Sequence, residues 1–250
     1  LEDWYRIILS RNQEEAIIYE KIINEHMNTI EDPSLHIQYS LFSLRYNLLL
    51  RDMNSSKALI KHLKSVQNNF SIEHSYYFNF FCGLFEYLDN NLLVSLEFFC
   101  KSEKLGKKIN KDDPYLFYLI SLVYSKLHHI SLAIHYSNIA LDKFNQNIDY
   151  IHIIDASTIL VINYIRTEMY DKAEKKLFQL LKLSRKLNNE YLISNIYHNL
   201  GYLYSKISKH DLSIQFYNKS LNYKKNNYQR YTNTIIYLVN EYLTLKKFDD

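Results

Sequence analysis

The stretch NLGYLYSKISKHDLSIQFYNKSL, residues 199–221, reads as one helix, a tight polar turn and a second helix. Three earlier stretches follow the same plan: FCGLFEYLDNNLLVSLEFFCKS (81–102), LISLVYSKLHHISLAIHYSNIAL (119–141) and LVINYIRTEMYDKAEKKLFQLL (160–181). A tyrosine of the first helix recurs every 40 residues, at Tyr124, Tyr164 and Tyr204. Because one helical pair cannot bury its apolar face alone, we expect the pairs to stack into a superhelix with the first helices on its concave side.

Small side chains mark where the two helices of each pair approach one another. Two antiparallel helices come close only where a short side chain faces the partner helix. The second helices carry such a residue at Ser95, Ala133, Ala173 and Ser213. A larger side chain about one turn later is expected to fill the space beside it, at Phe99, Tyr136, Leu177 and Tyr217. With Gly83 and Gly201 in first helices, the pattern resembles the tetratricopeptide repeat, with the period lengthened from about 34 to about 40 residues.

The composition supports an all-α fold. Of the 250 residues, 47% are hydrophobic, which is enough for a substantial core. Only 3 Gly and 2 Pro occur, and this scarcity favours long helices with short links. The net charge of +3 is close to neutral and does not indicate a nucleic-acid surface.

The sequence indicates a cytoplasmic protein. Cys82 and Cys100 are too few for a disulfide framework, which favours a reducing compartment. No apolar run approaches about 18 residues without a charge, so we expect no membrane span. The N-terminal LEDWYRI lacks the basic and apolar regions of a signal peptide. The chain begins without Met and a fifth repeat starting at Tyr231 is cut at Asp250, so we expect a fragment with further C-terminal repeats.

The N-terminal region has a different pattern from the repeats. Residues 4–30, 35–53 and 54–69 read as three amphipathic helices, the third with a Ser N-cap signal. The apolar face is expected at Trp4, Ile7, Ile8, Ile22, Ile23 and Met27 in the first helix and at Leu41, Leu44, Leu48 and Leu49 in the second. We therefore predict a three-helix bundle over residues 1–70 and a tetratricopeptide-like array over residues 71–250.

Three segments carry a more specific resemblance. WYRII (4–8), EDPSLHIQYSLFSLRYNLLL (31–50) and YYFNFFCGLFEY (76–87), followed by the 40-residue repeats, resemble the Rap family of bacterial response-regulator aspartate phosphatases and their relatives. The resemblance implies a bundle that binds a response regulator and an array that binds a secreted Phr signalling peptide. Some members dephosphorylate a regulator of sporulation, and others block DNA binding by a competence regulator without any chemistry.

The turn before the second helix bears on catalysis. In phosphatase members a Gln in this acidic turn reaches the acyl phosphate of the regulator, and the resemblance places that position at Pro33. Proline has neither a side-chain donor nor a backbone N–H, so Asp32-Pro33-Ser34 is expected to start a helix instead. Gln38 lies about 7 Å further along the helix axis, too far to take over the role. No catalytic residue is therefore predicted.

The resemblance also implies candidate binding residues. Asparagines on first helices hold the peptide backbone, because an amide both donates and accepts hydrogen bonds. The candidates are Asn163, Asn195, Asn199 and Asn240. Family members carry an acidic residue where this chain has Ile165, followed by Arg166, so a peptide with an acidic group is one expectation. The regulator is expected to contact Asp32, Gln38, Arg45 and Tyr46.

Other chemistry finds little support. The histidines His128, His129, His135 and His152 lack the ligand spacing of a metal site, and no cofactor is expected. No helix-turn-helix motif precedes the repeats, which argues against direct nucleic-acid binding. Three hypotheses stay open: a peptide-controlled Rap-type binder of a response regulator, an active phosphatase with an unrecognised catalytic group, and a generic tetratricopeptide scaffold.

Overall fold

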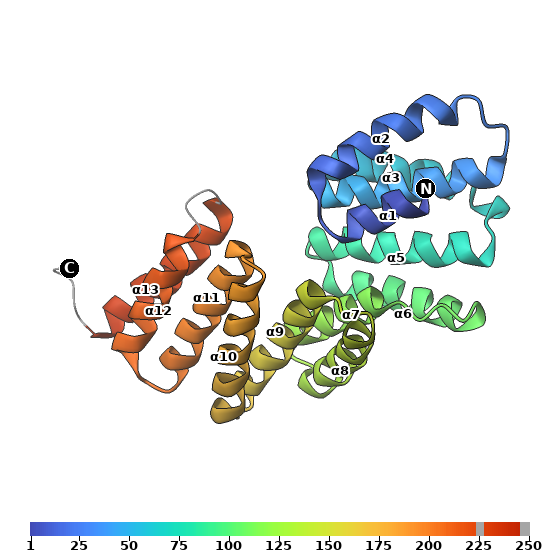
Figure 1. Ribbon diagram of the computed structural model, residues 1–250. Helices are drawn as coiled ribbons and strands as arrows, with labels where there is room; N and C mark the ends of the chain where they lie inside the picture. Colours follow the sequence, from blue (N-terminus) through green and yellow to red (C-terminus); the bar gives the residue numbers. More distant parts are fainter. Residues whose placement is uncertain (224–227, 246–250) are drawn as a thin grey trace. The chain divides into compact units, whose positions relative to one another are not determined.

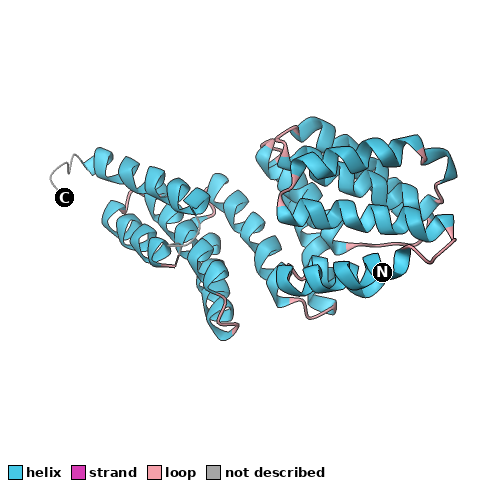
Figure 2. Cartoon of the chain, turned by 90° about the horizontal axis from the view of Figure 1, so that it is seen from above, coloured by secondary structure: helices cyan, strands magenta, loops and turns pink. Residues whose placement is uncertain are grey.

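The protein is built from helices alone in the part of the chain that the structure describes, residues 1–223 and 228–245. The structure is a computed structural model (Figures 1 and 2). The helices are α1 (Glu2–Leu9), α2 (Gln13–Met27), α3 (Pro33–Leu50), α4 (Met53–Ser65), the 3₁₀ turn η1 (Gln67–Asn69), α5 (Ile72–Leu88), α6 (Leu92–Lys108), α7 (Pro114–Lys126), α8 (Ile130–Gln146), α9 (Tyr150–Arg166), α10 (Tyr170–Lys186), α11 (Glu190–Lys206), α12 (His210–Asn222) and α13 (Tyr228–Leu245). The all-α prediction is confirmed. None of these helices is long and apolar enough to cross a membrane.

The chain folds into two compact units. The first comprises Leu1–Val123 and the second Tyr124–Asp250. The first unit contains the N-terminal helices together with α5 and α6, so the packing boundary lies beyond residue 70. The predicted division at residue 70 stays a prediction about binding. The predicted cut of the fifth repeat at Asp250 lies outside the described residues, whereas its first helix is α13.

The prediction of a single helix over residues 4–30 is wrong, because the segment forms two helices, α1 and α2. Arg11 adopts a left-handed conformation with φ of 62°, which ends α1 and turns the chain back. Asn12 then caps α2 by accepting a hydrogen bond from the Glu15 amide. The indole of Trp4 donates to the Ala16 carbonyl at 3.0 Å and fixes α1 against α2. Ile22, expected in the core, is 50% exposed.

The next two helices start at aspartates. Asp32 accepts a hydrogen bond from the Ser34 amide at 2.8 Å and Pro33 occupies the first helical turn, so the predicted helix start is confirmed. Asp52 caps α4 in the same way, accepting from the Ser55 amide at 3.0 Å. The expected Ser cap of this helix was wrong, because the carboxylate of Asp52, three residues before Ser55, supplies the acceptor.

Two helical pairs share one packing template, α5 with α6 and α11 with α12. In the second pair, Ser213 is fully buried and its hydroxyl donates to the Gly201 carbonyl at 2.9 Å. A Cβ atom on Gly201 would lie 2.6 Å from the Cδ1 atom of Tyr217, so the ring lies directly against the glycine. The same arrangement occurs in the first pair. The Ser95 hydroxyl donates to the Gly83 carbonyl at 2.8 Å, and a Cβ atom on Gly83 would lie 2.5 Å from the Cδ1 atom of Phe99. The predicted close approach at the small residues is confirmed.

The α9–α10 pair fills the same space differently. The positions of Gly201 and Tyr217, shifted back by the 40-residue repeat, hold Val161 and Leu177, both fully buried. Valine on the first helix is larger than the glycine of the other pair, and leucine on the second helix is smaller than its tyrosine, so the two changes compensate. In α8 the equivalent position is Ser137 and not the predicted Tyr136, which is half-buried. Tyr136 stacks on Tyr124 of α7, with ring centroids 5.7 Å apart.

The glycine contact predicts the effect of a single methyl group. Alanine is favoured over glycine in helices by about 1 kcal/mol, so a Gly→Ala change at a solvent-exposed helix position would stabilise the protein. Here the added Cβ meets the buried ring of Tyr217, and overpacking costs about 1–3 kcal/mol. We predict that Gly201→Ala lowers the melting temperature measured by circular dichroism.

The α9–α10 pair supplies the control for that measurement. Gly201→Val combined with Tyr217→Leu recreates the Val161–Leu177 pairing at the same place. We expect this double variant to melt closer to the parent protein than Gly201→Val alone. A melting temperature of Gly201→Ala equal to or above that of the parent would contradict the proposed contact.

Candidate functional site

Two consecutive first helices of the second unit, α9 and α11, lie in contact. Each carries a stripe of half-buried or exposed side chains at helical spacing. This stripe, which we call the first-helix face, consists of Asp155, Thr158, Ile162 and Arg166 on α9 and Asn195, His198, Tyr202 and Lys206 on α11. Each residue on α11 lies 40 positions after its counterpart on α9, so equivalent positions of successive repeats face the same side.

Asn195 and Asn199 lie one helical turn apart on α11. Asn195 is half-buried on the first-helix face, and Asn199 borders it with 8% of its surface exposed. Neither side chain makes a hydrogen bond to the residues that the structure describes. A nearly buried amide without a protein partner keeps its donors and acceptor for water or a ligand. Asn199 is therefore the predicted peptide residue whose environment fits that role best.

Asn163 lies in the interior. It is fully buried, and its side-chain nitrogen donates to the Ser125 hydroxyl at 3.1 Å and to the Ile159 carbonyl at 2.8 Å. Both amide hydrogens are thus used inside the protein, where they tie the end of α7 to α9. The repeat register explains the difference from Asn199, because Ile159 and not Asn163 occupies the equivalent position.

Arg166 joins the same cluster from the first-helix face. Its NH1 group donates to the Ser125 carbonyl at 2.5 Å and to the Ser125 hydroxyl at 3.0 Å, close to the C-terminus of α7. A cation there satisfies carbonyls that a helix end leaves without partners. The remaining guanidinium nitrogens have no partner among the described residues. Arg166 is therefore held in place with donors to spare.

A hollow of about 350 Å³ opens beside Arg166. Tyr202 and Lys206 of α11 also line it, and the Lys206 ammonium lies 5.5 Å from the centre of the Tyr202 ring. Glu168 and His128 complete the polar part of the lining. Two cations from equivalent repeat positions thus meet at one end of the first-helix face, where an anionic group would be attracted.

Polar contacts hold α13, the first helix of the fifth repeat, against α11 and α12. His198 of α11 forms a hydrogen bond with Thr234 at 3.1 Å, and His210 of α12 with the nearly buried Glu241 at 2.7 Å. Asn240, the fourth predicted peptide residue, is exposed on α13, and its carbonyl accepts from Thr244. In the repeat register Asn240 corresponds to the buried Leu200, so it does not share the position of Asn199.

Of the predicted regulator-binding residues, Asp32 is exposed and Gln38 is half-buried, whereas Arg45 and Tyr46 are buried. Asp32 is exposed at the start of α3, and the Gln38 amide donates to the Glu2 carboxylate at 2.8 Å. Arg45 is only 3% exposed, and its NH2 group lies 3.4 Å from the Tyr115 hydroxyl. Tyr46 is buried with its ring 5.5 Å from that of Trp4. The structure thus places Arg45 and Tyr46 inside the first unit.

Several ionisable groups lie at or just before the start of α7 or contact it. The Arg45 guanidinium lies 5.5 Å from the centre of the Tyr115 ring. Asp113 accepts a hydrogen bond from the Tyr76 hydroxyl at 3.2 Å, and burial raises the pKa of its carboxyl. Lys111 reaches Glu73 at 2.8 Å and the Tyr77 hydroxyl at 2.6 Å. These contacts join α3 and α5 to the start of α7, which is a structural role.

The described residues contain no group of three or more His, Cys, Asp or Glu side chains able to hold a metal ion. His152 pairs with Asp149 at 2.6 Å at the start of α9, and His128 adopts a left-handed conformation in the turn after α7. Both cysteines are free thiols. Burial raises the pKa of Cys82 to about 12, which makes its thiol a poor nucleophile.

Sequence reasoning missed part of this arrangement. The 40-residue spacing, applied to every residue of the first helices, would have found Arg166 and Lys206 as an equivalent pair. It would also have separated Asn163 from Asn199. The burial of Arg45 left no such signal, because its partner Tyr115 lies 70 residues away in the chain.

Comparisons with known proteins agree with this architecture. Residues 1–51 match the family model described as "response regulator aspartate phosphatase H, N terminal". The chain is 31% identical over 249 residues to the transcriptional activator NprA of Geobacillus stearothermophilus, covering 98% of this chain and 61% of NprA. It is 27% identical over 225 residues to the regulatory protein RapD of Bacillus subtilis (strain 168), covering 88% and 64%. The chain therefore spans less than two thirds of the length of both relatives.

A solved structure shows the same fold. NprR in complex with its cognate peptide NprX superimposes with a TM-score of 0.90 at 22% identity, covering 99% of this chain and 73% of that one. Together with the family match, these relatives confirm the resemblance to the Rap family that the sequence predicted.

The contrast between the two asparagines can be measured. Asn163→Ala removes a buried amide and leaves Ser125 with fewer partners, which costs about 1–3 kcal/mol. Asn199→Ala removes no hydrogen bond to a described residue, so it should lower the free energy of unfolding by less than Asn163→Ala does. Urea denaturation followed by circular dichroism measures both. Equal losses of stability would show that Asn199 is also a structural residue.

Proposed function

We propose that this Rap-type protein binds a bacterial response regulator through residues 1–70 and a short signalling peptide through the first-helix face of its second unit. The observation that carries the peptide-binding part of this proposal concerns Asn199, which is 8% exposed beside that face and whose side chain makes no hydrogen bond to the described residues. The regulator half follows from the match of residues 1–51 to the N-terminal family model. Peptide binding would then shift the protein between states of different affinity for the regulator.

The relatives support a peptide ligand. NprR has been solved with its cognate peptide, and it shares the fold of this chain at a TM-score of 0.90. An Asn amide can pair with the N–H and C=O groups of any peptide unit, so Asn195 and Asn199 would hold the backbone without regard to its side chains. Specificity must then come from neighbouring residues of the first-helix face.

Arg166 and Lys206 are our candidates for that specificity. Both lack an anionic partner among the described residues, and Arg166 is fixed by its bonds to Ser125. A fixed donor loses little conformational freedom when it binds a carboxylate. Lys206 follows Asn199 by seven residues, which is about 10 Å along the helix axis. An extended peptide covers that distance in about three residues.

These distances predict which peptides the protein selects. From a pool of random hexapeptides passed over the immobilised protein, we expect enrichment of peptides with a carboxylate about three residues from the unit held at Asn199. Mass spectrometry of the bound fraction identifies them, and amidated C-termini separate a terminal carboxylate from a side-chain one. Asn199→Ala should weaken binding of the selected peptides about tenfold or more.

A charge reversal provides the control. Lys206→Glu should shift the enrichment towards basic peptides, whereas Lys182→Glu, an exposed change on α10 outside the face, should leave it unaltered. Enrichment of the same peptides by the parent protein and Lys206→Glu would exclude this carboxylate site. Failure to retain any hexapeptide would instead count against the peptide-binding function as a whole.

Residues 1–70 are proposed to act on the response regulator by binding it, without catalysing a reaction. Pro33 occupies the first turn of α3, where it has no group able to orient a water molecule. Gln38 is held by Glu2 at 2.8 Å and lies further along the helix. Asp32 is exposed and Gln38 is half-buried, so a partner can reach both, whereas Arg45 and Tyr46 would act by fixing the shape of α3.

A phosphate-release assay tests whether the protein binds the response regulator without dephosphorylating it. Mixed with a receiver domain phosphorylated on its aspartate, the protein should leave the rate of phosphate release unchanged, because no side chain at Pro33 positions a water molecule. Co-purification of the regulator with the protein shows binding in the same sample. Accelerated release that Gln38→Ala abolishes would establish the phosphatase alternative.

Transcription activation is a second candidate function. The chain is 31% identical to NprA, which is named a transcriptional activator, over 98% of its own length. The regulator-binding proposal and this alternative differ in the partner that the peptide-bound protein recognises. Gel-shift experiments with the complete natural protein and promoter DNA, with and without selected peptide, distinguish them.

A further inference from the structure

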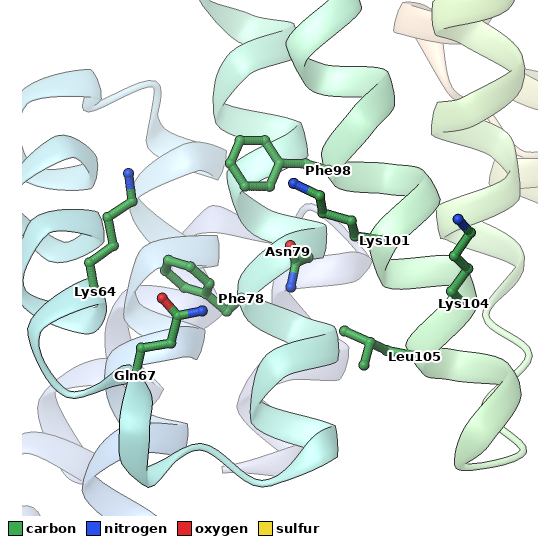
Figure 3. A pocket seen from close by; sticks show the side chains of 8 residues that line it. All are labelled: Lys64, Gln67, Phe78, Asn79, Phe98, Lys101, Lys104 and Leu105. Atoms are coloured by element: carbon green, nitrogen blue, oxygen red, sulfur yellow. The ribbon is translucent and has the colours of Figure 1, made fainter.

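A cluster of lysines lies on the first unit, on residues that do not belong to the first-helix face. One hollow of about 430 Å³ is bounded by Lys64 of α4 and by Lys101 and Lys104 of α6 (Figure 3). In Figure 3, Phe78 and Asn79 of α5 lie between the α4 and α6 lysines. The helices α4 and α6 thus present their cations on either side of one concave surface.

A second hollow extends this surface along α4. It measures about 520 Å³, shares Lys64 with the first, and adds Lys57 and Lys61. These three lysines follow one another at intervals of four and three residues, so they share one face of the helix. We call the combined lining the lysine surface; its cations are Lys57, Lys61, Lys64, Lys101 and Lys104.

The charge of the lysine surface is not balanced locally. No Asp or Glu lines either hollow, and none of its five lysines forms an ion pair with the described residues. Elsewhere on α6, Lys107 pairs with Glu103 at 2.7 Å. The whole chain has 30 basic and 27 acidic residues, so five unpaired cations around one surface are a marked concentration. Such a surface attracts and orients an anionic partner.

The lining is also partly apolar. The buried Phe78 and the half-buried Phe98 and Leu105 contribute to the first hollow, and Ala58 and Ile60 to the second. The Lys101 ammonium lies 5.4 Å from the centre of the Phe98 ring. An occupant that fits both features has apolar side chains flanked by carboxylates. A phosphate backbone would satisfy the cations but leave this apolar lining without a complement.

The extent of the surface also favours a polypeptide over a small anion. Lys57 and Lys64 are seven residues apart, which is about 10 Å along α4, and the first hollow continues from there to α6. We propose that the lysine surface binds an acidic amphipathic segment of a partner protein. This surface includes α6, outside residues 1–70, and does not depend on the peptide site of the second unit.

Fluorescence anisotropy with synthetic probes tests this proposal. The acidic probe is a labelled 14-residue peptide of Glu and Leu at helical spacing, and its comparison is the same peptide with Lys in place of Glu. We expect only the acidic probe to bind, and its binding to weaken with rising salt concentration. A third probe, oligothymidylate, should bind more weakly than the acidic peptide.

Two triple variants with equal charge change locate the site. Lys64→Gln, Lys101→Gln and Lys104→Gln together should weaken binding of the acidic probe about tenfold, since three exposed charge pairs are lost. Lys172→Gln, Lys175→Gln and Lys182→Gln, exposed on α10, should change it less than about twofold. All six lysine side chains are exposed, so both variants should retain the melting temperature of the parent.

Three results would overturn the proposal. Equal weakening by the two triple variants would indicate a response to net charge alone. Tighter binding of oligothymidylate than of the acidic peptide would indicate a nucleic-acid surface. The third result is no binding of the acidic peptide at any concentration.

Discussion

The close approach of the two helices within each pair is the constraint on which the other features depend. At Gly201 the backbone of α11 lies against the ring of Tyr217, and the buried Ser213 hydroxyl donates to the Gly201 carbonyl. Such contact is possible only where the side chain on one helix is absent or small. Because the pairs repeat every 40 residues, this spacing places equivalent residues of successive first helices side by side. The first-helix face is a consequence of that register.

Polar residues within this apolar stack have two distinct roles. Asn163 and Arg166 converge on Ser125 and satisfy polar groups near the end of α7, which is what burial of polar groups requires. Asn199 is almost as buried but has no such partner in the described residues. The proposed ligand-binding residues are those whose hydrogen-bonding capacity is not used within the protein. Residue type alone does not separate the two roles.

The sequence was sufficient for the fold class and for much of the packing. The small residues Ser95, Ala173 and Ser213 and the helix start at Asp32-Pro33 are predictable because they depend on local or periodic patterns. The break at Arg11 was missed because a non-glycine residue adopts the left-handed conformation there. The burial of Arg45 and Asn163 was missed because their partners lie 70 and 38 residues away in the chain. Exposure of a polar residue depends on such distant contacts, which periodicity does not report.

Amide hydrogen exchange with and without a selected hexapeptide tests the central claim most directly, namely that the ligand lies on the first helices of the second unit. The account predicts added protection in α9 and α11, greatest around Asn195 and Asn199, where the peptide excludes water and restrains the helices. Protection confined to the second helices α10 and α12, or to α1–α4, would contradict it.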